Sequence, residues 1–142
     1  MGSPMAGHLL KAGHQLFVNT VGAVPADIAS AAKVCASGKE VAQNADLIII
    51  MVPDTPDVAA VLFGENGVAT GLSKGKTVVD MSSISPVETK EFAKKINALG
   101  CDYLDAPVSG GDVGAKNATL SIMVGGEQTA FDRVKPVFEL MG

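Results

Sequence analysis

The sequence predicts an α/β fold, built on a doubly wound sheet of mostly parallel strands. Two observations carry this prediction. Helical and extended patterns alternate along the chain, and the runs "LIIIMV" (47–52) and "TVVDM" (77–81) lack the alternation of a strand with one wet face. Continuous apolar strands are typical of a parallel sheet that helices cover on both faces.

Composition narrows the class of protein. The chain has 142 residues, of which 47% are hydrophobic and 18% charged, as expected for one domain with a sizeable core. Its net charge of −4 argues against a nucleic-acid or anionic-membrane partner. The run at 47–52 is far shorter than a membrane span, and we see no signal peptide. Cys35 and Cys101 form no metal or redox motif, so we expect a reduced, cytoplasmic setting.

Capping and turn residues divide the chain into its elements. The expected helices cover residues 3–12, 25–32, 39–45, 55–64, 85–100 and about 128–141. The expected strands cover residues 15–19, 33–37, 46–52, 76–81, 101–108 and 119–126. Ser3 is expected to cap the first helix, and Ser85 to form a capping box with Glu88. The glycine-rich stretch after residue 108 predicts a loop.

Small and polar residues follow three successive predicted strands. They are Pro53-Asp54-Thr55-Pro56, Ser82-Ser83-Ile84-Ser85 and Ser109-Gly110-Gly111. Each stretch alone could be an ordinary turn. Because parallel strands end at one edge of a sheet, the three together favour a ligand crevice there.

The first helix opens like the second half of a phosphate-binding loop. Only Gly2 could remain of a Gly-x-Gly-x-x-Gly pattern, and the amides near Gly2, Ser3 and Met5 would point at a pyrophosphate. Ordinary helix capping explains the same residues. Asn19 or Thr20 stands where an NAD site usually has an acidic residue, which is compatible with NADP; no arginine follows, so both cofactors stay open.

Four segments carry a resemblance to a known family. They are "MGSPMAGHLLKAGH", "IIMVPDTPDVAAVLFGENG", "VVDMSSISPVETKEFA" and "YLDAPVSGGDVGAKNATLSIMVGG". The chain resembles the β-hydroxyacid dehydrogenases, which include 3-hydroxyisobutyrate and 6-phosphogluconate dehydrogenases. Within the family it is most similar to members that reduce tartronate semialdehyde (2-hydroxy-3-oxopropionate). The phrase "DAPVSGG" is the most specific, although Ala118 replaces a glycine of the pattern that follows it.

The resemblance implies that residues 1–142 form a partial Rossmann domain for NADP or NAD, with NADPH slightly favoured. It implies that Ser109, Gly110 and Gly111 hold the carboxylate of a small 2- or 3-hydroxy or oxo acid. The implied cofactor-binding residues are Gly2, Ser3, Pro4, Met5, Asn19, Thr20, Met51, Val52, Pro53 and Ser83, the last near the nicotinamide.

The family pattern also contains parts that have no counterpart in this sequence. A strand carrying the first two glycines would precede Met1, and a helical domain with a catalytic lysine and asparagine would follow Gly142. None of the lysines present matches that motif. We therefore expect the chain alone to bind cofactor weakly or not at all and to be inactive, and the full-length protein to be a homo-oligomer.

Several functions stay open. The leading one is the cofactor domain of a reductase that converts 2-hydroxy-3-oxopropionate to glycerate by hydride transfer from NAD(P)H. The alternatives are the domain of a 3-hydroxyisobutyrate-type dehydrogenase and a non-catalytic binding or assembly module. The ends of the chain are either natural or those of a truncated record.

Overall fold

A computed structural model describes residues 1–142. The helices are α1 (Gly2–Lys11), α2 (Ala26–Ala29), α3 (Gly38–Asn44), α4 (Thr55–Phe63), α5 (Val68–Gly71), α6 (Pro86–Ala98), α7 (Gly111–Asn117) and α8 (Gln128–Phe138). The strands are β1 (Phe17–Val18), β2 (Lys33–Val34), β3 (Leu47–Ile50), β4 (Thr77–Asp80), β5 (Asp102–Asp105), β6 (Val108–Ser109) and β7 (Ser121–Ile122). None of the helices combines the length and apolar character needed to cross a bilayer.

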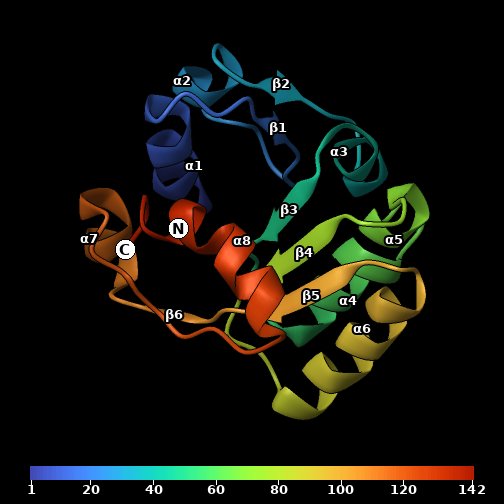
Figure 1. Ribbon diagram of the computed structural model, residues 1–142. Helices are drawn as coiled ribbons and strands as arrows, with labels where there is room; N and C mark the ends of the chain where they lie inside the picture. Colours follow the sequence, from blue (N-terminus) through green and yellow to red (C-terminus); the bar gives the residue numbers. More distant parts are fainter.

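The strands confirm an α/β fold with mostly parallel pairing. β3, β4 and β5 form one parallel sheet in which Ile48, Val78 and Tyr103 lie in register. β1 and β2 form a second parallel pair, whereas β6 and β7 are antiparallel. In Figure 1 the parallel strands cross the molecule in the order β2, β1, β3, β4, β5.

The strands belong to three separate sheets, because β1 and β3 form no hydrogen-bonded ladder with each other. β1 and β3 therefore each present an edge without a strand partner, and the parallel strands are divided into two sheets.

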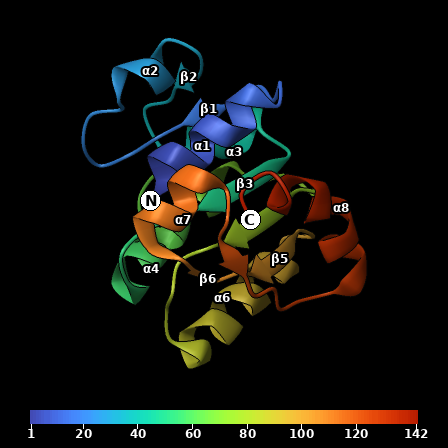
Figure 2. The same cartoon turned by 90° about the vertical axis from the view of Figure 1, so that its left-hand side faces the viewer.

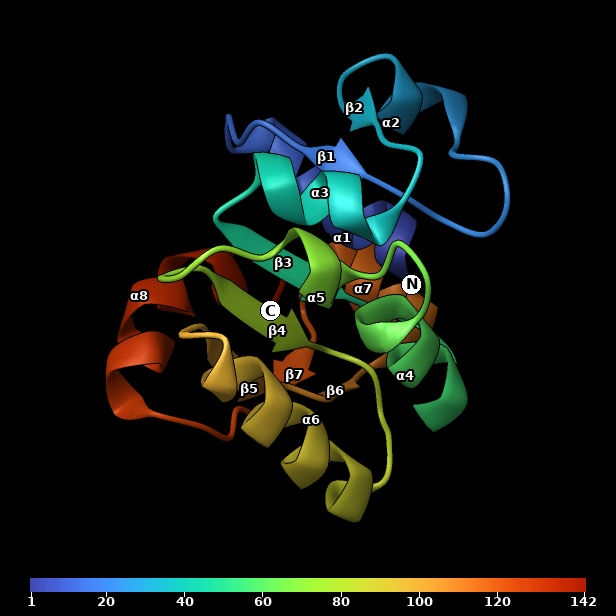
Figure 3. The same ribbon diagram turned by 90° about the vertical axis from the view of Figure 1, so that its right-hand side faces the viewer.

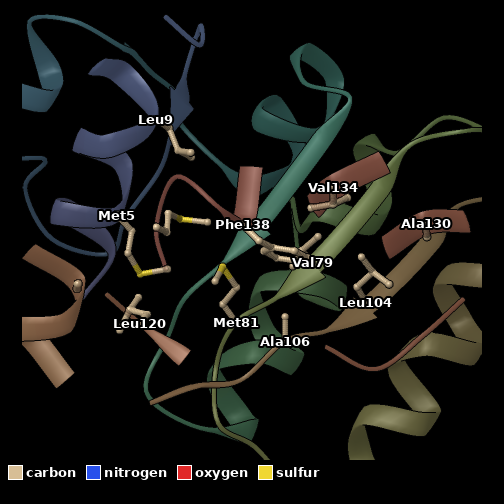
Figure 4. Close-up of a cluster of buried hydrophobic side chains, with 12 residues drawn as sticks. Met5, Leu9, Val79, Met81, Leu104, Ala106, Leu120, Ala130, Val134 and Phe138 are labelled. Carbon is tan, nitrogen blue, oxygen red and sulfur yellow. The ribbon is translucent and has the colours of Figure 1, made fainter. Parts of the chain in front are cut away.

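Helices cover both faces of the β3–β4–β5 sheet, and each face has its own core. α3, α4, α5 and α6 lie on one side (Figure 3). The core on that side includes Val58, Leu62, Phe92 and Ile96. α1, α7 and α8 supply the other core, in which side chains of α1 and α8 meet those of β4 and β5 (Figure 4). This arrangement matches the continuous apolar runs of β3 and β4, since a strand covered on both faces needs apolar residues on both.

The structure differs from the expected elements in three places. The glycine-rich stretch after residue 108 contains helix α7, and a short helix α5 interrupts the expected loop after α4. Gly110 and Gly111 have φ angles of 132° and 61°, so they turn the chain sharply where α7 begins. The expected strand at 119–126 shrinks to the two residues of β7.

Two expected helix caps are also wrong. α1 begins at Gly2 with Met1 as its N-cap, so Ser3 lies inside the first turn. Ser85 is the N-cap residue of α6, but its side chain makes no cap bond, so the expected capping box with Glu88 does not form. Asp54 instead caps α4 and forms a capping box with Asp57. A carboxylate at an N-cap accepts backbone N–H groups well, which stabilises the first turn of α4.

Candidate functional site

Two loops at the carboxyl edge of the sheet are bonded to each other. The ladder between β3 and β4 continues as far as the bond from the Met81 amide to the Ile50 carbonyl (2.8 Å). Beyond it, the Val52 amide donates to Ser82 Oγ (2.9 Å), and the Ser85 amide donates to Thr55 Oγ1 (3.1 Å). Side-chain oxygens thus hold the loop after β3 against the loop after β4.

A buried carboxylate holds these loops in place through hydrogen bonds. Asp80 is the last residue of β4 and is 0% exposed. Its Oδ1 accepts the Ser82 amide (2.9 Å), and its Oδ2 accepts the Tyr103 hydroxyl (3.3 Å). Because Ser82 in turn accepts the Val52 amide, one hydrogen-bonded network joins the ends of β3 and β4 to β5.

The electrostatics of this edge follow from burial. Burial raises the pKa of Asp80, and its hydrogen bonds to Ser82 and Tyr103 oppose that rise. The pKa of Tyr103 is also raised, first by burial and then by the Asp80 charge. Asp105 lies beside Asp80 on the next strand, and burial and the Asp80 charge both raise its pKa. Its carboxylate makes no hydrogen bond, although its backbone pairs with Gly125.

The cofactor residues expected after β3 and β4 lie next to this network. Pro53 and Ser83 are exposed, whereas Met51 and Val52 are half-buried. Ser83 follows directly on Ser82, which is 0% exposed. The buried serine therefore fixes the loop, and the exposed serine is available to a ligand. An exposed hydroxyl and small residues at this edge fit a dinucleotide, which needs close approach and hydrogen-bond donors.

The residues expected to bind the pyrophosphate lie at the start of α1. Gly2 and Ser3 are exposed, Pro4 is half-buried, and the Met5 side chain lies in the core with 3% exposure. Met5 can thus meet a ligand only through its backbone. α1 and α7 lie side by side (Figure 2), and His8 Nε2 donates to the Ala115 carbonyl (2.7 Å). This bond ties the middle of α1 to α7.

An open cavity of about 350 Å³ lies along α1. Its lining includes Ser3 and Pro4, and continues to side chains of α2 and α7. The lining residues are Ser3, Pro4, Gly7, His8, Lys11, Asp27 and Lys116. The structure therefore brings the start of α1 close to α2 and α7.

Asn19 and Thr20 follow β1 and so belong to the other parallel sheet. Both residues are exposed. The Asn19 side-chain amide donates to the Cys35 carbonyl (3.0 Å), which ties the end of β1 to the end of β2. The β1–β2 sheet, after which Asn19 and Thr20 lie, is not hydrogen-bonded as a ladder to the β3–β4–β5 sheet.

The expected substrate residues form an exposed turn. Ser109 pairs with Ser121 in the short antiparallel sheet, and Gly110 and Gly111 lead into α7. All three are exposed. The Gly110 position is tight, since a Cβ there would lie 3.2 Å from Leu120 Cδ2. The positive φ disfavours any residue with a side chain at Gly110, and the bare backbone stays accessible there.

Asp80 and Tyr103 were not among the expected site residues, and Thr55 and Ser82 were expected only as members of the loops beside the crevice. A charged residue at the end of the otherwise apolar run "TVVDM" was the signal for Asp80. A buried carboxylate needs hydrogen-bond partners, so this position predicts a polar network. The identity of the partners depends on the register of β4 with β5, which a sequence pattern does not give.

Comparisons with known proteins identify the family of this domain. A protein-family model described as the NAD-binding domain of 6-phosphogluconate dehydrogenase matches residues 1–142. The chain belongs to this family of NAD-binding domains. The match confirms the resemblance to the β-hydroxyacid dehydrogenases, which are NAD(P)-dependent oxidoreductases.

Individual relatives of this NAD-binding domain agree with the assignment to the family. The 2-hydroxy-3-oxopropionate reductase of Escherichia coli (strain K12) is 59% identical over 143 residues, which cover 100% of this chain and 49% of the relative. A 3-hydroxyisobutyrate dehydrogenase from Salmonella typhimurium superposes with a TM-score of 0.89 at 34% identity, over 99% of this chain and 50% of that one. Psf3, solved with NADP⁺ and 2-OPP, gives a TM-score of 0.90 at 25% identity, over 99% and 51% of the two chains.

The chain spans about half the length of the curated relatives that it matches. The family gives this domain its cofactor class, NAD or NADP.

Proposed function

We propose that this chain is the cofactor-binding part of a reductase that converts 2-hydroxy-3-oxopropionate to glycerate. The 59% identity to the E. coli reductase over the whole chain is the observation that carries the proposal. When bound, NADPH or NADH supplies the hydride for the aldehyde carbon. A proton must reach the aldehyde oxygen in the same conversion, so the product carries a second hydroxyl group.

In this proposal, each part of the cofactor binds at a different element of the fold. The loops after β3 and β4, with Met51, Val52, Pro53 and Ser83, lie along the nicotinamide half of the cofactor. The exposed start of α1 donates amides to the pyrophosphate. Asn19 and Thr20 face the adenosine half, where the absence of a carboxylate favours NADPH over NADH.

The substrate would bind beside Ser109, Gly110 and Gly111. A hydroxyl and accessible backbone amides suit a carboxylate, which takes several convergent donors. None of the lysines in the chain matches the catalytic motif of the family, so we expect residues 1–142 alone to show no turnover.

A chimera tests the proposal. The matched stretch of the E. coli 2-hydroxy-3-oxopropionate reductase is replaced by residues 1–142 of this chain. We expect the purified chimera to oxidise NADPH when 2-hydroxy-3-oxopropionate is added. A second candidate is a 3-hydroxyisobutyrate-type dehydrogenase, favoured by the 34% identity to the Salmonella enzyme. Preferential oxidation of 3-hydroxyisobutyrate by the chimera would replace the first assignment with the second.

A further inference from the structure

The inference concerns the amide of Val52, which leaves the backbone ladder of the sheet. Up to Ile50, β3 and β4 are joined by backbone bonds. At Val52 the acceptor is instead the hydroxyl of Ser82, at 2.9 Å. A side-chain oxygen thus replaces a backbone carbonyl as the acceptor, at the point where the segments after β3 and β4 diverge toward the ligand edge.

Ser82 acts on this edge without reaching a ligand itself. It is 0% exposed, so its hydroxyl serves the protein interior. Its own amide is held by Asp80 Oδ1 at 2.9 Å. Two bonds at one residue therefore set both the backbone position of Ser82 and the direction of its hydroxyl.

Burying the carboxylate of Asp80 in the strand costs free energy. A carboxylate taken out of water needs compensating hydrogen bonds, and an apolar residue in a buried strand needs none. Asp80 ends a fully buried strand in which Val78 and Val79 precede it. Its carboxylate does what an apolar residue cannot, since it accepts both the Ser82 amide and the Tyr103 hydroxyl.

We propose that Asp80 and Ser82 are positioning residues for the cofactor: they hold the Val52 amide and Ser83 in the mutual arrangement that the nicotinamide half of the dinucleotide requires. This inference rests on the proposed function for the identity of the ligand. Asp80 fixes Ser82, Ser82 fixes Val52, and Ser83 follows Ser82 in the chain. The substrate turn at Ser109–Gly111 lies outside this network.

A split between two Michaelis constants follows from that separation. Loss of the Ser82 hydroxyl should raise KM and Kd for NADPH about three- to tenfold, the cost of one buried hydrogen bond. The KM for 2-hydroxy-3-oxopropionate should change less than twofold. General loosening of the domain would raise both constants together.

The experiment uses the chimera defined above with variants at two positions. Ser82→Ala and Asp80→Ala should each weaken NADPH binding, and the double variant should be no weaker than the worse single one, because both act through one network. Asp80→Asn keeps an oxygen that accepts the Ser82 amide, so it should stay within about twofold of the parent. Thr89→Val is the matched control, because it removes a buried hydroxyl that has no partner.

The outcomes separate the two proposals. Unchanged NADPH binding in Ser82→Ala, or an equal rise in both Michaelis constants, would overturn the positioning role. If Asp80→Ala does not fold, the comparison of Ser82→Ala with Thr89→Val decides. A parent chimera that binds NADPH but reduces no substrate would refute the substrate assignment alone, since Kd still reports on the network. A folded chimera that binds neither cofactor would overturn both proposals.

Discussion

Two carboxylates lie side by side at the end of the parallel sheet. Asp80 and Asp105 occupy matching positions of β4 and β5. Like charges on neighbouring strands repel, and burial adds to the cost of the charged forms. Asp80 has hydrogen bonds that offset this cost, whereas the Asp105 side chain has none.

Replacing Asp105 with asparagine should therefore stabilise the fold at neutral pH. Folding raises the pKa of Asp105 above its unfolded value, so its contribution to stability is full below about pH 4 and is lost as pH rises through the folded-state pKa. We expect Asp105→Asn to raise the melting temperature by about 1–2 °C at pH 7, and the gain to vanish toward pH 4. Thermal melts between pH 4 and pH 8 measure this.

Asp112→Asn is the matched control for that experiment, because the Asp112 side chain is 76% exposed. It should change the melting temperature little at any pH. A gain in Asp105→Asn that grows as the pH falls would contradict the sign of the effect.

Thr89 carries the one buried side-chain oxygen that has no hydrogen-bond partner. Thr89 lies in α6, on the side of the sheet that α3, α4 and α5 also cover, and is 8% exposed. Valine has the same shape without the hydroxyl, so the cost of burying an unpaired polar group disappears. We expect Thr89→Val to gain about 1 kcal/mol in unfolding free energy. A loss of stability in urea unfolding would show that the hydroxyl has a partner after all.

At the scale of elements, α5 packs on α3 through a glycine. A Cβ on Gly71 would lie 2.2 Å from the Lys39 carbonyl oxygen, which is a backbone atom and cannot move away alone. Gly7 in α1 is the opposite case, because a Cβ there would have no neighbour within 4 Å.

Alanine at these two positions should have opposite effects. Gly71→Ala should cost about 2 kcal/mol or more through the clash, and Gly7→Ala should gain about 0.5–1 kcal/mol from helix propensity. Urea unfolding of both variants measures the difference. Equal effects would mean that α3 and α5 separate without cost.

The same elements show what a sequence can and cannot predict. α6 was expected at 85–100 and spans Pro86–Ala98, because a proline and an apolar stripe define it locally. α7 was expected to be a loop, since its glycines disfavour a helix. Gly114 of α7 packs against Leu120, with a Cβ position 3.1 Å from Leu120 Cδ2. Tertiary packing therefore determines that this segment is helical, and the local sequence pattern does not predict it.

Caps show a related limit. Ser85 and Glu88 have the spacing of a capping box, yet the box forms at Asp54 and Asp57 instead. The Ser85 amide donates to Thr55, which lies at the start of another helix. A contact between loops that are distant in sequence overrides the local motif.

At the scale of the whole molecule, the sequence predicts the layers but not the continuity of the sheet. The apolar runs of β3 and β4 imply helices on both faces, and two cores confirm it. Whether β1 and β3 pair depends on how the two strands are placed in space, which a sequence pattern does not give. The ligand edge was predicted from its loops, whereas the buried network behind it depends on the register of β4 with β5.

The interruption between the two parallel sheets leads to the last prediction. Asn19 and Thr20 follow a strand of the β1–β2 sheet, and Val52 and Ser83 follow strands of the other sheet. A dinucleotide that touches both must fix their separation on binding, and that ordering lowers the affinity. We expect residues 1–142 alone to bind NADPH and NADH at least about tenfold more weakly than the chimera, where contacts with the rest of the E. coli enzyme can hold the two sheets in place. Calorimetric titration of both proteins measures the ratio. Equal affinities would mean that the two sheets are already held in place within residues 1–142.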